Sequence, residues 1–456
     1  MITSTAFASK RYAVLGLARS GAAAVEALLA SGAQVTVWDR QPEPRAAYEG
    51  RCTIADPLEL DLTGYDGVVV SPGVPLNTHP IGPHAAQYRV PVIGDIELFA
   101  QARAELPPHK VVGVTGTNGK STTVALLDHI LKDAGVPCVL GGNIGEPIMA
   151  QAPLPEGGVY VLELSSFQID LTRSLDCDVV ALTNITPDHL DRYTGFAEYA
   201  ASKERLFEMQ GEGRVAIISG EDGASRGIAE RLAQRHLLLI DIDMADIKAQ
   251  GVGTDLSPSL AGPHNAQNAA VALAIAANCG VSQDQVASSL ASYTGLPHRM
   301  EIVCEEDGVL FINDSKATNT ASTAPALAAY PPTEGRPRLH WIVGGLAKEE
   351  GLGDCADHLG NVAAAYTVGE AAASFAEHLA GKVPRIERCE LISEAVRRAR
   401  EFAQPGDIVL LSPACASYDQ FRDYEKRGEH FRQLVGVIAE GEPDCDSTKP
   451  GEGNAV

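Results

Sequence analysis

The stretch Val112-Gly-Val-Thr-Gly-Thr-Asn-Gly-Lys-Ser-Thr122 reads as an apolar strand that ends in a glycine-containing turn and continues into a helix. Glycines in such a turn let backbone N–H groups converge on an anion, and the N-terminus of the helix adds its positive dipole end. Lys120 would supply a positive charge, and the Ser121 hydroxyl would suit a Mg²⁺ ion. The stretch therefore predicts a site for the phosphates of a nucleoside triphosphate.

This loop differs from the general phosphate-loop pattern at one position. The pattern has a glycine, four further residues and then Gly-Lys-Ser or Gly-Lys-Thr. Here Val114 occupies the place of the first glycine, and Gly116 stands inside the loop instead. A glycine-rich turn without a ligand is the alternative, but the combination of strand, Gly-Lys-Ser and helix favours a phosphate site.

The composition limits the class of protein. The chain has 456 residues, too many for a single hydrophobic core, and we expect three domains. Its 36 Lys and Arg stand against 59 Asp and Glu, which gives a net charge of -23. This charge argues against nucleic acid or an anionic membrane as a partner. An anionic substrate would have to meet locally placed Lys and Arg.

Membrane and secretion signals are not apparent in the sequence. The longest apolar run, 269–277, is well short of the roughly 20 residues needed to span a bilayer. The N-terminus shows no charged region followed by an apolar stretch. The nine cysteines include no Cys-x-x-Cys pair, which fits reduced thiols better than a disulfide framework. We therefore expect a cytoplasmic protein without membrane insertion. A monomer is a separate expectation.

The first domain, predicted at residues 1–105, opens with a strand, a helix and a second strand. The first strand enters a turn at Gly16, an alanine-rich helix follows, and the second strand ends at Asp39. The turn resembles a dinucleotide fingerprint, but Ala18 replaces its second glycine and would crowd a pyrophosphate. A Rossmann-like domain that holds no dinucleotide is the better interpretation.

The second domain, predicted at residues 106–298, begins with the phosphate loop. Its apolar strands alternate with helical segments, which implies a parallel sheet covered on both faces. The strands are expected at 136–140, 159–164, 179–182 and 215–218. Ligands of such sheets bind at the carboxyl ends of the strands. Three polar side chains follow strands in this domain: Asn143, Glu163 and His189.

These polar side chains have alternative readings. Glu163 would suit Mg²⁺, although a carboxylate at a strand end can also be a cap. His189 is flanked by Asp188 and Asp191, which favours a site over a structural histidine. Lys203 lies on an amphipathic helix, where a lysine is by default a solvated charge. Composition alone gives no reason to select it.

The third domain is predicted at residues 299–440, and 441–456 are predicted to form a disordered acidic tail. A hairpin around Gly308 is followed by further alternation of strands and helices, which predicts a Rossmann-like α/β domain. Two loops after strands carry groups that are unusual for mere connections. One loop holds Asp314, Lys316 and Thr318, and the other is Ser-Pro-Ala-Cys-Ala-Ser417. Both loops would face one cleft.

Seven short motifs follow one another within residues 11–438. They are Thr-Gly-Thr-Asn-Gly-Lys-Ser-Thr, Gly-Gly-Asn-Ile-Gly, Leu-Glu-Leu-Ser-Ser-Phe-Gln, Pro-Asp-His-Leu-Asp-Arg-Tyr, Gly-Leu-Pro-His-Arg, Asn-Asp-Ser-Lys-Ala-Thr-Asn and Leu-Ser-Pro-Ala-Cys-Ala-Ser. Together they resemble the Mur ligase family, whose members add amino acids to the UDP-linked muramoyl precursor of bacterial peptidoglycan. The last two motifs resemble the D-glutamate-adding member in particular.

The resemblance implies an ATP-dependent amide ligase with a UDP-binding, an ATP-binding and an amino-acid-binding domain. ATP would phosphorylate the terminal carboxylate of UDP-N-acetylmuramoyl-L-alanine. The amine of D-glutamate would then attack the acyl phosphate and release phosphate, with ADP as the other product. Physical logic agrees, because a carboxylate is a poor electrophile until one of its oxygens becomes part of a leaving group.

The resemblance also implies roles for individual residues. ATP would be bound by Thr117, Asn118, Gly119, Lys120, Ser121, Thr122, Thr123, Asn268, Arg299 and Asp314. The UDP-linked substrate would contact Arg19, Ser20, Asp39, Arg40, Gly73 and Asn143. D-Glutamate would contact Lys316, Thr318, Lys348 and Ser417. The implied catalytic residues are Lys120, Glu163, His189 and Lys203. Two Mg²⁺ sites would use Ser121, Glu163, His189 and Lys203, the lysine as a carbamate.

Two positions depart from the family pattern. Gly-Gly-Leu-Ala-Lys348 stands where Gly-Gly-Asp-Gly-Lys is usual, and Tyr424 stands where phenylalanine is usual near the D-glutamate pocket. The alternatives are a sister or folylpolyglutamate-type ligase, a nucleotide-binding regulatory module without catalysis, and an NAD-dependent oxidoreductase. The loop at Asp314 weighs against a sister or folylpolyglutamate-type ligase. The four implied catalytic residues weigh against a regulatory module, and Ala18 weighs against an oxidoreductase.

Overall fold

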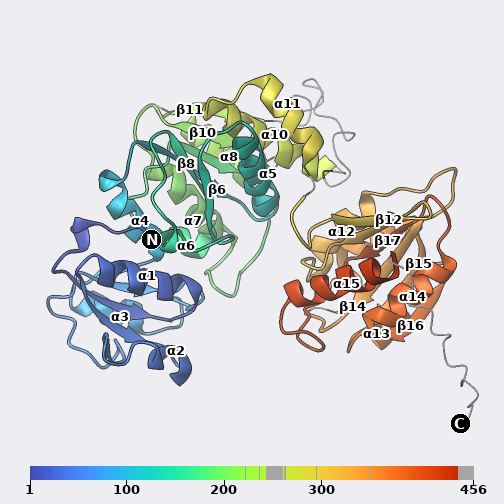
Figure 1. The fold of residues 1–456 in the computed structure, drawn as a ribbon, viewed down its shortest axis with the longest axis horizontal. Coiled ribbons are helices and arrows are strands. Elements are labelled where there is room, and N and C mark those ends of the chain that lie inside the picture. Colours follow the sequence, from blue (N-terminus) through green and yellow to red (C-terminus); the bar gives the residue numbers. More distant parts are fainter. Residues whose placement is uncertain are drawn as a thin grey trace, which may run out of the picture. The chain divides into compact units, whose positions relative to one another are not determined.

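The structure is a computed structural model, and it describes residues 1–220, 222–235, 237–242, 260, 263–293, 295–348 and 350–439. Its contacts divide the chain into two compact units. Unit 1 contains Met1–Leu256 and Pro263–Tyr293, and unit 2 contains Ser257–Gly262 and Thr294–Val456. Figure 1 labels the elements in both. The predicted α/β class is confirmed, whereas the three predicted domain boundaries stay a prediction, and the predicted tail at 441–456 lies outside the described residues.

The first sheet, in unit 1, is parallel throughout and has the strand order β3-β2-β1-β4-β5. Its strands are β1 (Arg11–Leu15), β2 (Gln34–Trp38), β3 (Thr53–Ile54), β4 (Gly67–Val70) and β5 (Val92–Ile93). The accompanying helices are η1 (Thr5–Phe7), α1 (Arg19–Ala30), α2 (Pro42–Ala46), α3 (Ile81–Gln87), α4 (Asp95–Ala102) and η2 (Arg103–Glu105).

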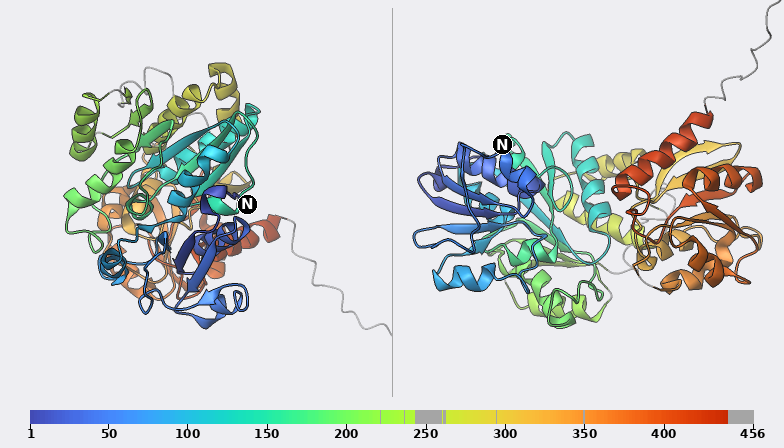
Figure 2. Two further views of the ribbon diagram at one scale, coloured as in Figure 1. Left: turned by 90° about the vertical axis from the view of Figure 1, so that its left-hand side faces the viewer. Right: turned by 90° about the horizontal axis from the view of Figure 1, so that it is seen from below.

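Successive side chains of β1 point to opposite faces of this sheet, and helices cover both faces. Tyr12 and Val14 share a core with residues of α1 and α4, whereas Ala13 and Leu15 share one with residues of α3. Figure 2 shows this sheet in blue, with helices around it. The strand order reverses between β1 and β4, and ligands of open parallel sheets bind at such a point.

The second sheet, also in unit 1, is parallel throughout and has the order β11-β10-β9-β6-β8-β7. Its strands are β6 (His109–Thr115), β7 (Cys138–Gly142), β8 (Gly158–Glu163), β9 (Val179–Leu182), β10 (Val215–Ile218) and β11 (Leu238–Asp241). Its helices are α5 (Lys120–Asp133), η3 (Ile148–Ala150), α6 (Ser166–Asp170), α7 (Phe196–Glu208), α8 (Gly223–Leu232), α10 (Pro263–Asn278) and α11 (Gln283–Ser292). Every residue of β8 and β9 is buried, as expected for a parallel sheet covered on both faces.

The third sheet, in unit 2, has the order β12-β13-β17-β14-β15-β16, and only its edge strand β12 is antiparallel. Its strands are β12 (Glu301–Glu306), β13 (Val309–Asn313), β14 (Leu339–Gly344), β15 (Val362–Val368), β16 (Ile386–Glu390) and β17 (Ile408–Leu411). Its helices are α12 (Thr320–Ala328), η5 (Gly353–Asn361), α13 (Ala372–Leu379), α14 (Ile392–Phe402) and α15 (Tyr424–Ala439). The predicted hairpin is confirmed. No helix in the described ranges is long and apolar enough to cross a membrane.

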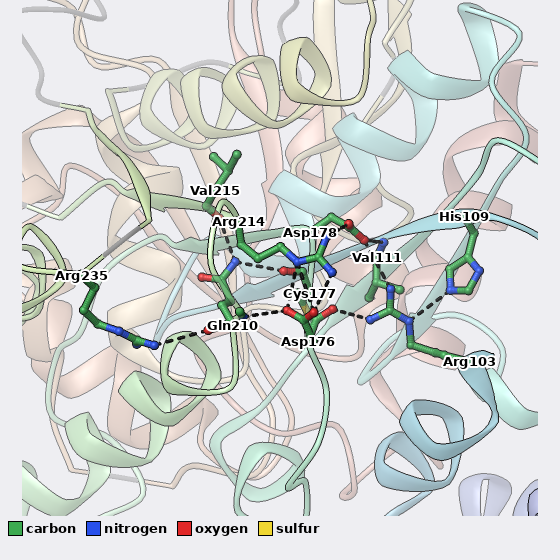
Figure 3. A network of polar contacts seen from close by, with 11 residues as sticks. Arg103, His109, Val111, Asp176, Cys177, Asp178, Gln210, Arg214, Val215 and Arg235 are labelled. Carbon is green, nitrogen blue, oxygen red and sulfur yellow. Dashed lines mark hydrogen bonds and ion pairs between the residues drawn. The ribbon is translucent and has the colours of Figure 1, made fainter.

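A network of polar contacts joins η2, the last helix in the group around the first sheet, to the second sheet (Figure 3). Arg103, which begins η2, donates a hydrogen bond to the carbonyl of Asp176 and lies 3.4 Å from Asp178. Arg214 donates to Asp176 Oδ2 at 2.6 Å and also pairs with Asp178. Asp178 accepts the backbone N–H of Val111 at 2.8 Å. Two arginines therefore fix the starts of β6, β9 and β10.

Arg214→Met should lower the free energy of unfolding by about 2 kcal/mol, because Asp178 would lose a cation in a largely buried site. Partial burial alone would raise the pKa of Asp176, but hydrogen bonds from Arg214 and Gly211 lower it. The stabilisation should therefore be present above the unfolded-state pKa of Asp176 and disappear as pH falls through the folded-state value. Urea unfolding at neutral and acidic pH measures both effects.

Arg231→Met is the matched control. Arg231 pairs with Glu204 at 2.6 Å, but its side chain is mostly exposed, so its loss should cost less than about 1 kcal/mol. An equal loss of unfolding free energy in the two variants would contradict a special role of the network around Asp178.

Candidate functional site

The phosphate loop, residues 116–119, connects β6 to α5 and is shaped by two glycines. Gly116 has a φ of 145° and Gly119 a φ of 84°. A Cβ atom at Gly116 would lie 2.0 Å from Thr183 Oγ1, and one at Gly119 would lie 2.1 Å from Asn268 Oδ1. Neither position has room for a side chain, so the loop backbone approaches its neighbours closely.

Two polar residues directly after β9 hold the loop from one side. Asn184 accepts the Asn118 N–H at 2.9 Å with its Oδ1 and donates to the Asn118 carbonyl at 3.1 Å with its Nδ2. Thr183 Oγ1 donates to the same carbonyl at 2.6 Å. Thr183 and Asn184 are not among the site residues expected from the sequence. A signal existed, because they form a polar pair at the carboxyl end of a buried strand next to β6.

Lys120 begins α5 and turns back over the loop. Its Nζ donates to the Gly116 carbonyl at 2.9 Å and to the Thr117 carbonyl at 2.8 Å. In the described part of the chain, no side chain caps α5 at Gly119. The first turn of α5 therefore presents its backbone N–H groups and a lysine at the carboxyl end of β6, which is an arrangement that can bind phosphate.

Lys203, on α7, is buried beside the same loop and is only 2 % exposed. Its Nζ donates to the Gly116 carbonyl at 2.8 Å and lies 4.6 Å from the centre of the Tyr199 ring. Burial and then the charge of Lys120 lower the pKa of Lys203 well below its ordinary value of 10.5. The composition of α7 suggests a solvated charge here, and that default is wrong because this face of the helix covers the sheet.

Glu163 ends β8 and pairs in register with Val114 of β6. Its Oε1 accepts a hydrogen bond from Asn143 Nδ2 at 2.8 Å. Its Oε2 is buried and has no hydrogen-bond partner among the described residues. A buried carboxylate oxygen without a donor is costly, and a bound cation would satisfy it. The donor set at this position therefore fits a Mg²⁺ ligand.

His189 lies on the exposed loop after β9, in the left-handed region with a φ of 51°. Its Nε2 is 3.5 Å from Asp188 Oδ2, and its ring centre is 6.4 Å from that of Tyr199. Tyr199 thus contacts both His189 and Lys203. Within the ranges that the structure describes, no group of three or more His, Cys, Asp and Glu side chains could hold a metal ion.

The residues implied for the UDP-linked substrate lie mostly at the carboxyl edge of the first sheet. Asp39 accepts the Leu17 N–H at 2.7 Å and the Gln41 N–H at 2.9 Å, so it also shapes the turn after β1. Arg19 donates to the Gly145 carbonyl at 2.8 Å. Other implied residues in this region are Ser20, Arg40 and Gly73. A pocket beside Gly73 is lined by residues that include Pro72, Val74, Phe167, Arg192 and Tyr193.

In unit 2, Asp314 follows β13 and is buried. Its Oδ2 accepts a hydrogen bond from Ser412 Oγ at 2.7 Å, and its Oδ1 accepts the Met300 N–H at 3.2 Å. Burial raises the pKa of Asp314 to about 7, against the effect of these hydrogen bonds. Arg299 lies in a turn closed by a bridge to Leu296.

The residues implied for D-glutamate lie on loops after three adjacent strands, β13, β17 and β14. Lys348 Nζ donates to Thr318 Oγ1 at 3.1 Å. Lys316 Nζ lies 5.1 Å from the centre of the Tyr424 ring, and Ser417 is buried. The sheet therefore gathers all four side-chain positions at one edge of unit 2.

A phosphate loop beside a buried carboxylate is typical of proteins that bind a nucleoside triphosphate with its Mg²⁺. Family models identify the class of protein more closely. The model of the Mur ligase middle domain matches residues 114–276, and that of the Mur ligase, glutamate ligase domain matches residues 298–415. The chain belongs to the Mur ligase family.

Relatives with the name UDP-N-acetylmuramoylalanine--D-glutamate ligase match along the whole chain. The protein from Novosphingobium aromaticivorans is 60% identical, covering 99% of this chain and 100% of the relative. The proteins of this name from Sphingopyxis alaskensis and Zymomonas mobilis are 59% and 51% identical, each over 96% of this chain and 100% of the relative.

Solved structures share the fold at low identity. UDP-N-acetylmuramate-alanine ligase from Thermotoga maritima has a TM-score of 0.57 at 16% identity, over 94% of this chain and 99% of its own. MurF from Acinetobacter baumannii has a TM-score of 0.54 at 18% identity, over 96% and 92%. E. coli FolC in complex with ADP has a TM-score of 0.53 at 20% identity, over 76% and 94%.

Gly119→Ala should weaken binding of a nucleoside triphosphate by about tenfold or more, because the new methyl group would displace Asn268 and distort the loop. Gly135→Ala is the control. Gly135 also has a positive φ, of 75°, but a Cβ there meets nothing within 4 Å, so only backbone strain of about 1 kcal/mol is added. Titration with a fluorescent ATP analogue compares the two. Indistinguishable affinities would contradict the assigned role of the loop.

Proposed function

We propose that the protein joins D-glutamate to UDP-N-acetylmuramoyl-L-alanine at the expense of ATP, through an acyl phosphate. The names of the relatives that match the whole chain support the substrates. The observation that carries the chemistry is the set of groups around the phosphate loop: two lysines at the Gly116 carbonyl and the unsatisfied Oε2 of Glu163. Such a reaction belongs to the cytoplasm, where ATP and the nucleotide-linked precursor are made.

Lys120 and the N–H groups of the first turn of α5 would bind the ATP phosphates. Thr117, Asn118 and Gly119 lie in the phosphate loop, Ser121, Thr122 and Thr123 lie in the first turn of α5, and Asn268 would lie against Gly119. Lys120 would exchange its two carbonyl acceptors for phosphate oxygens, which bind an ammonium more strongly. Ser121 and Glu163 would hold Mg²⁺, which neutralises phosphate charge when bound.

We also propose that Lys203 works as a carbamate. Burial lowers the pKa of Lys203, which favours the neutral amine, and a neutral amine can add to carbon dioxide with loss of one proton. The product would present carboxylate oxygens to a second cation, with His189 as the other ligand. The buried position beside the Gly116 carbonyl supports this role, because a permanently charged ammonium would be costly there.

The two substrates would occupy the remaining groups of residues. The UDP-linked substrate would contact Arg19, Ser20, Asp39, Arg40, Gly73 and Asn143 in unit 1. Lys316, Thr318, Lys348 and Ser417 in unit 2 would bind D-glutamate, with Arg299 and Asp314 assigned to the nucleotide. Lysines and hydroxyls are suitable donors for the two carboxylates of the amino acid.

The purified protein, with ATP, Mg²⁺ and UDP-N-acetylmuramoyl-L-alanine, should release phosphate about a hundredfold faster with D-glutamate than with L-glutamate or D-aspartate. A site built to bind two carboxylates at fixed spacing leaves buried donors unpaired when one is misplaced. A coupled phosphate assay measures the rates. Absence of turnover, or equal rates with all three amino acids, would refute the proposed reaction.

Lys203→Ala should lower the rate by about a hundredfold or more, and acetate or propionate should restore part of it by replacing the carbamate oxygens. Lys132→Ala is the control, because Lys132 is exposed and pairs with Asp128 one turn away on α5. Its rate should match the parent's. If short carboxylates give no recovery in Lys203→Ala while ATP binding stays normal, the carbamate proposal is wrong.

A further inference from the structure

Arg427 lies on α15 and is only 2 % exposed, which is rare for an arginine. Its guanidinium joins two loops. Nε donates to Ser315 Oγ at 3.0 Å and one terminal nitrogen donates to the Ser315 carbonyl at 2.8 Å. The other terminal nitrogen donates to the Cys415 carbonyl at 3.0 Å. One side chain therefore connects the loop after β13 to the loop after β17.

A third loop, which follows β14, lies against the same guanidinium. Gly345 has a φ of 131°, and a Cβ there would come within 3.2 Å of an Arg427 nitrogen and 2.4 Å of the Ala416 carbonyl. Leu346 and Ala416 exchange two backbone hydrogen bonds of 2.9 Å. The absence of a side chain at Gly345 thus allows the loop after β14 to meet both the loop after β17 and Arg427.

These three loops carry all the residues proposed to bind D-glutamate. Lys316 and Thr318 follow Ser315, Lys348 follows Gly345, and Ser417 follows Cys415. Each proposed contact lies one to three residues from Ser315, Gly345 or Cys415, the residues next to the guanidinium. The spacing of the contacts therefore depends on how Arg427 holds the loops together.

Arg427 forms no ion pair with a carboxylate among the residues that the structure describes. Its guanidinium donates to two carbonyls and one hydroxyl. Burial lowers the pKa of Arg427 to about 10, so the group remains a cation at neutral pH. Asp419 and Asp314 carry carboxylates that act on Arg427 from a longer range. A buried cation in this position adds to the positive potential that a dicarboxylate would meet.

We propose that Arg427 is a positioning residue for the amino-acid substrate. It sets the distances between Lys316, Lys348 and Ser417 without touching the substrate, and its charge favours a dicarboxylate at that edge of the sheet. The identity of the amino acid rests on the proposed function. A general structural brace is the competing role, and it would affect all substrates alike.

Arg427→Lys separates these roles. A lysine keeps the charge but has one nitrogen, which does not span Ser315 and Cys415 together. With D-glutamate varied, the KM should rise by about tenfold or more, since two hydrogen bonds are lost. The KM values for ATP and for UDP-N-acetylmuramoyl-L-alanine should stay within about twofold, because the lysine keeps the positive charge near Asp314 and leaves its hydrogen bonds from Ser412 Oγ and the Met300 N–H in place.

Lys426→Met is the matched control. Lys426 is the preceding residue on α15, its side chain is exposed, and it pairs with Glu429 at 2.7 Å. The variant removes one positive charge from the same helix without touching the loops. All three KM values should equal those of the parent, which distinguishes the position of Arg427 from the net charge of α15.

A rise of all three KM values in Arg427→Lys, or no rise in the KM for D-glutamate, would overturn the proposal. Should Arg427→Lys fail to fold, Ser315→Ala leaves the arginine in place but removes the hydroxyl that accepts from Arg427 Nε and donates to the Tyr424 carbonyl at 2.8 Å. It should raise the KM for D-glutamate alone by about threefold, the effect of one weak hydrogen bond; an unchanged KM would likewise overturn the proposal. The parent protein is the separate check on the proposed function, because it must use D-glutamate in the same assay.

Discussion

The close approach of the phosphate loop to the backbone and side chains around it is the constraint on which the rest of unit 1 depends. Gly116 and Gly119 have positive φ values and no space for a Cβ atom. Because of that proximity, the Gly116 carbonyl can meet both Lys120 and Lys203. The parallel sheet supports this arrangement by placing β6 between β8 and β9. Glu163 at the end of β8 and the Thr183–Asn184 pair directly after β9 therefore flank the loop.

Much of the fold could be predicted because its central strands are continuous apolar runs between turn signals. β8, β9 and β10 follow from their sequences almost to the residue. β3 and β5 have two residues each, and β16 reads Ile-Glu-Arg-Cys-Glu, so their pairing comes from neighbouring strands more than from their own composition. The helix at Arg19 begins earlier than its alanine-rich part suggests, because Ala18 already has an extended backbone and ends the turn.

The residues of the candidate site also differ in how far the sequence predicts them. Lys120 and Glu163 stand at strand ends, where residue type and position together point to a ligand. The burial of Lys203 depends on which face of α7 covers the sheet, and a single amphipathic helix does not reveal that. Arg427 binds Ser315 across 112 residues, a pairing that only the folded chain shows. Leu346 stands where the family usually has aspartate. The loop after β14 accommodates it, because backbone atoms of Leu346 make the bridge to Ala416.

The central claim is chemical: ATP turns the carboxylate of the nucleotide-linked substrate into an acyl phosphate before the amine attacks. Oxygen-isotope transfer tests it most directly. If the terminal carboxylate of UDP-N-acetylmuramoyl-L-alanine carries heavy oxygen, phosphate released during turnover with D-glutamate should contain one labelled oxygen, as read by mass spectrometry. Turnover that yields phosphate without the label would contradict the claim.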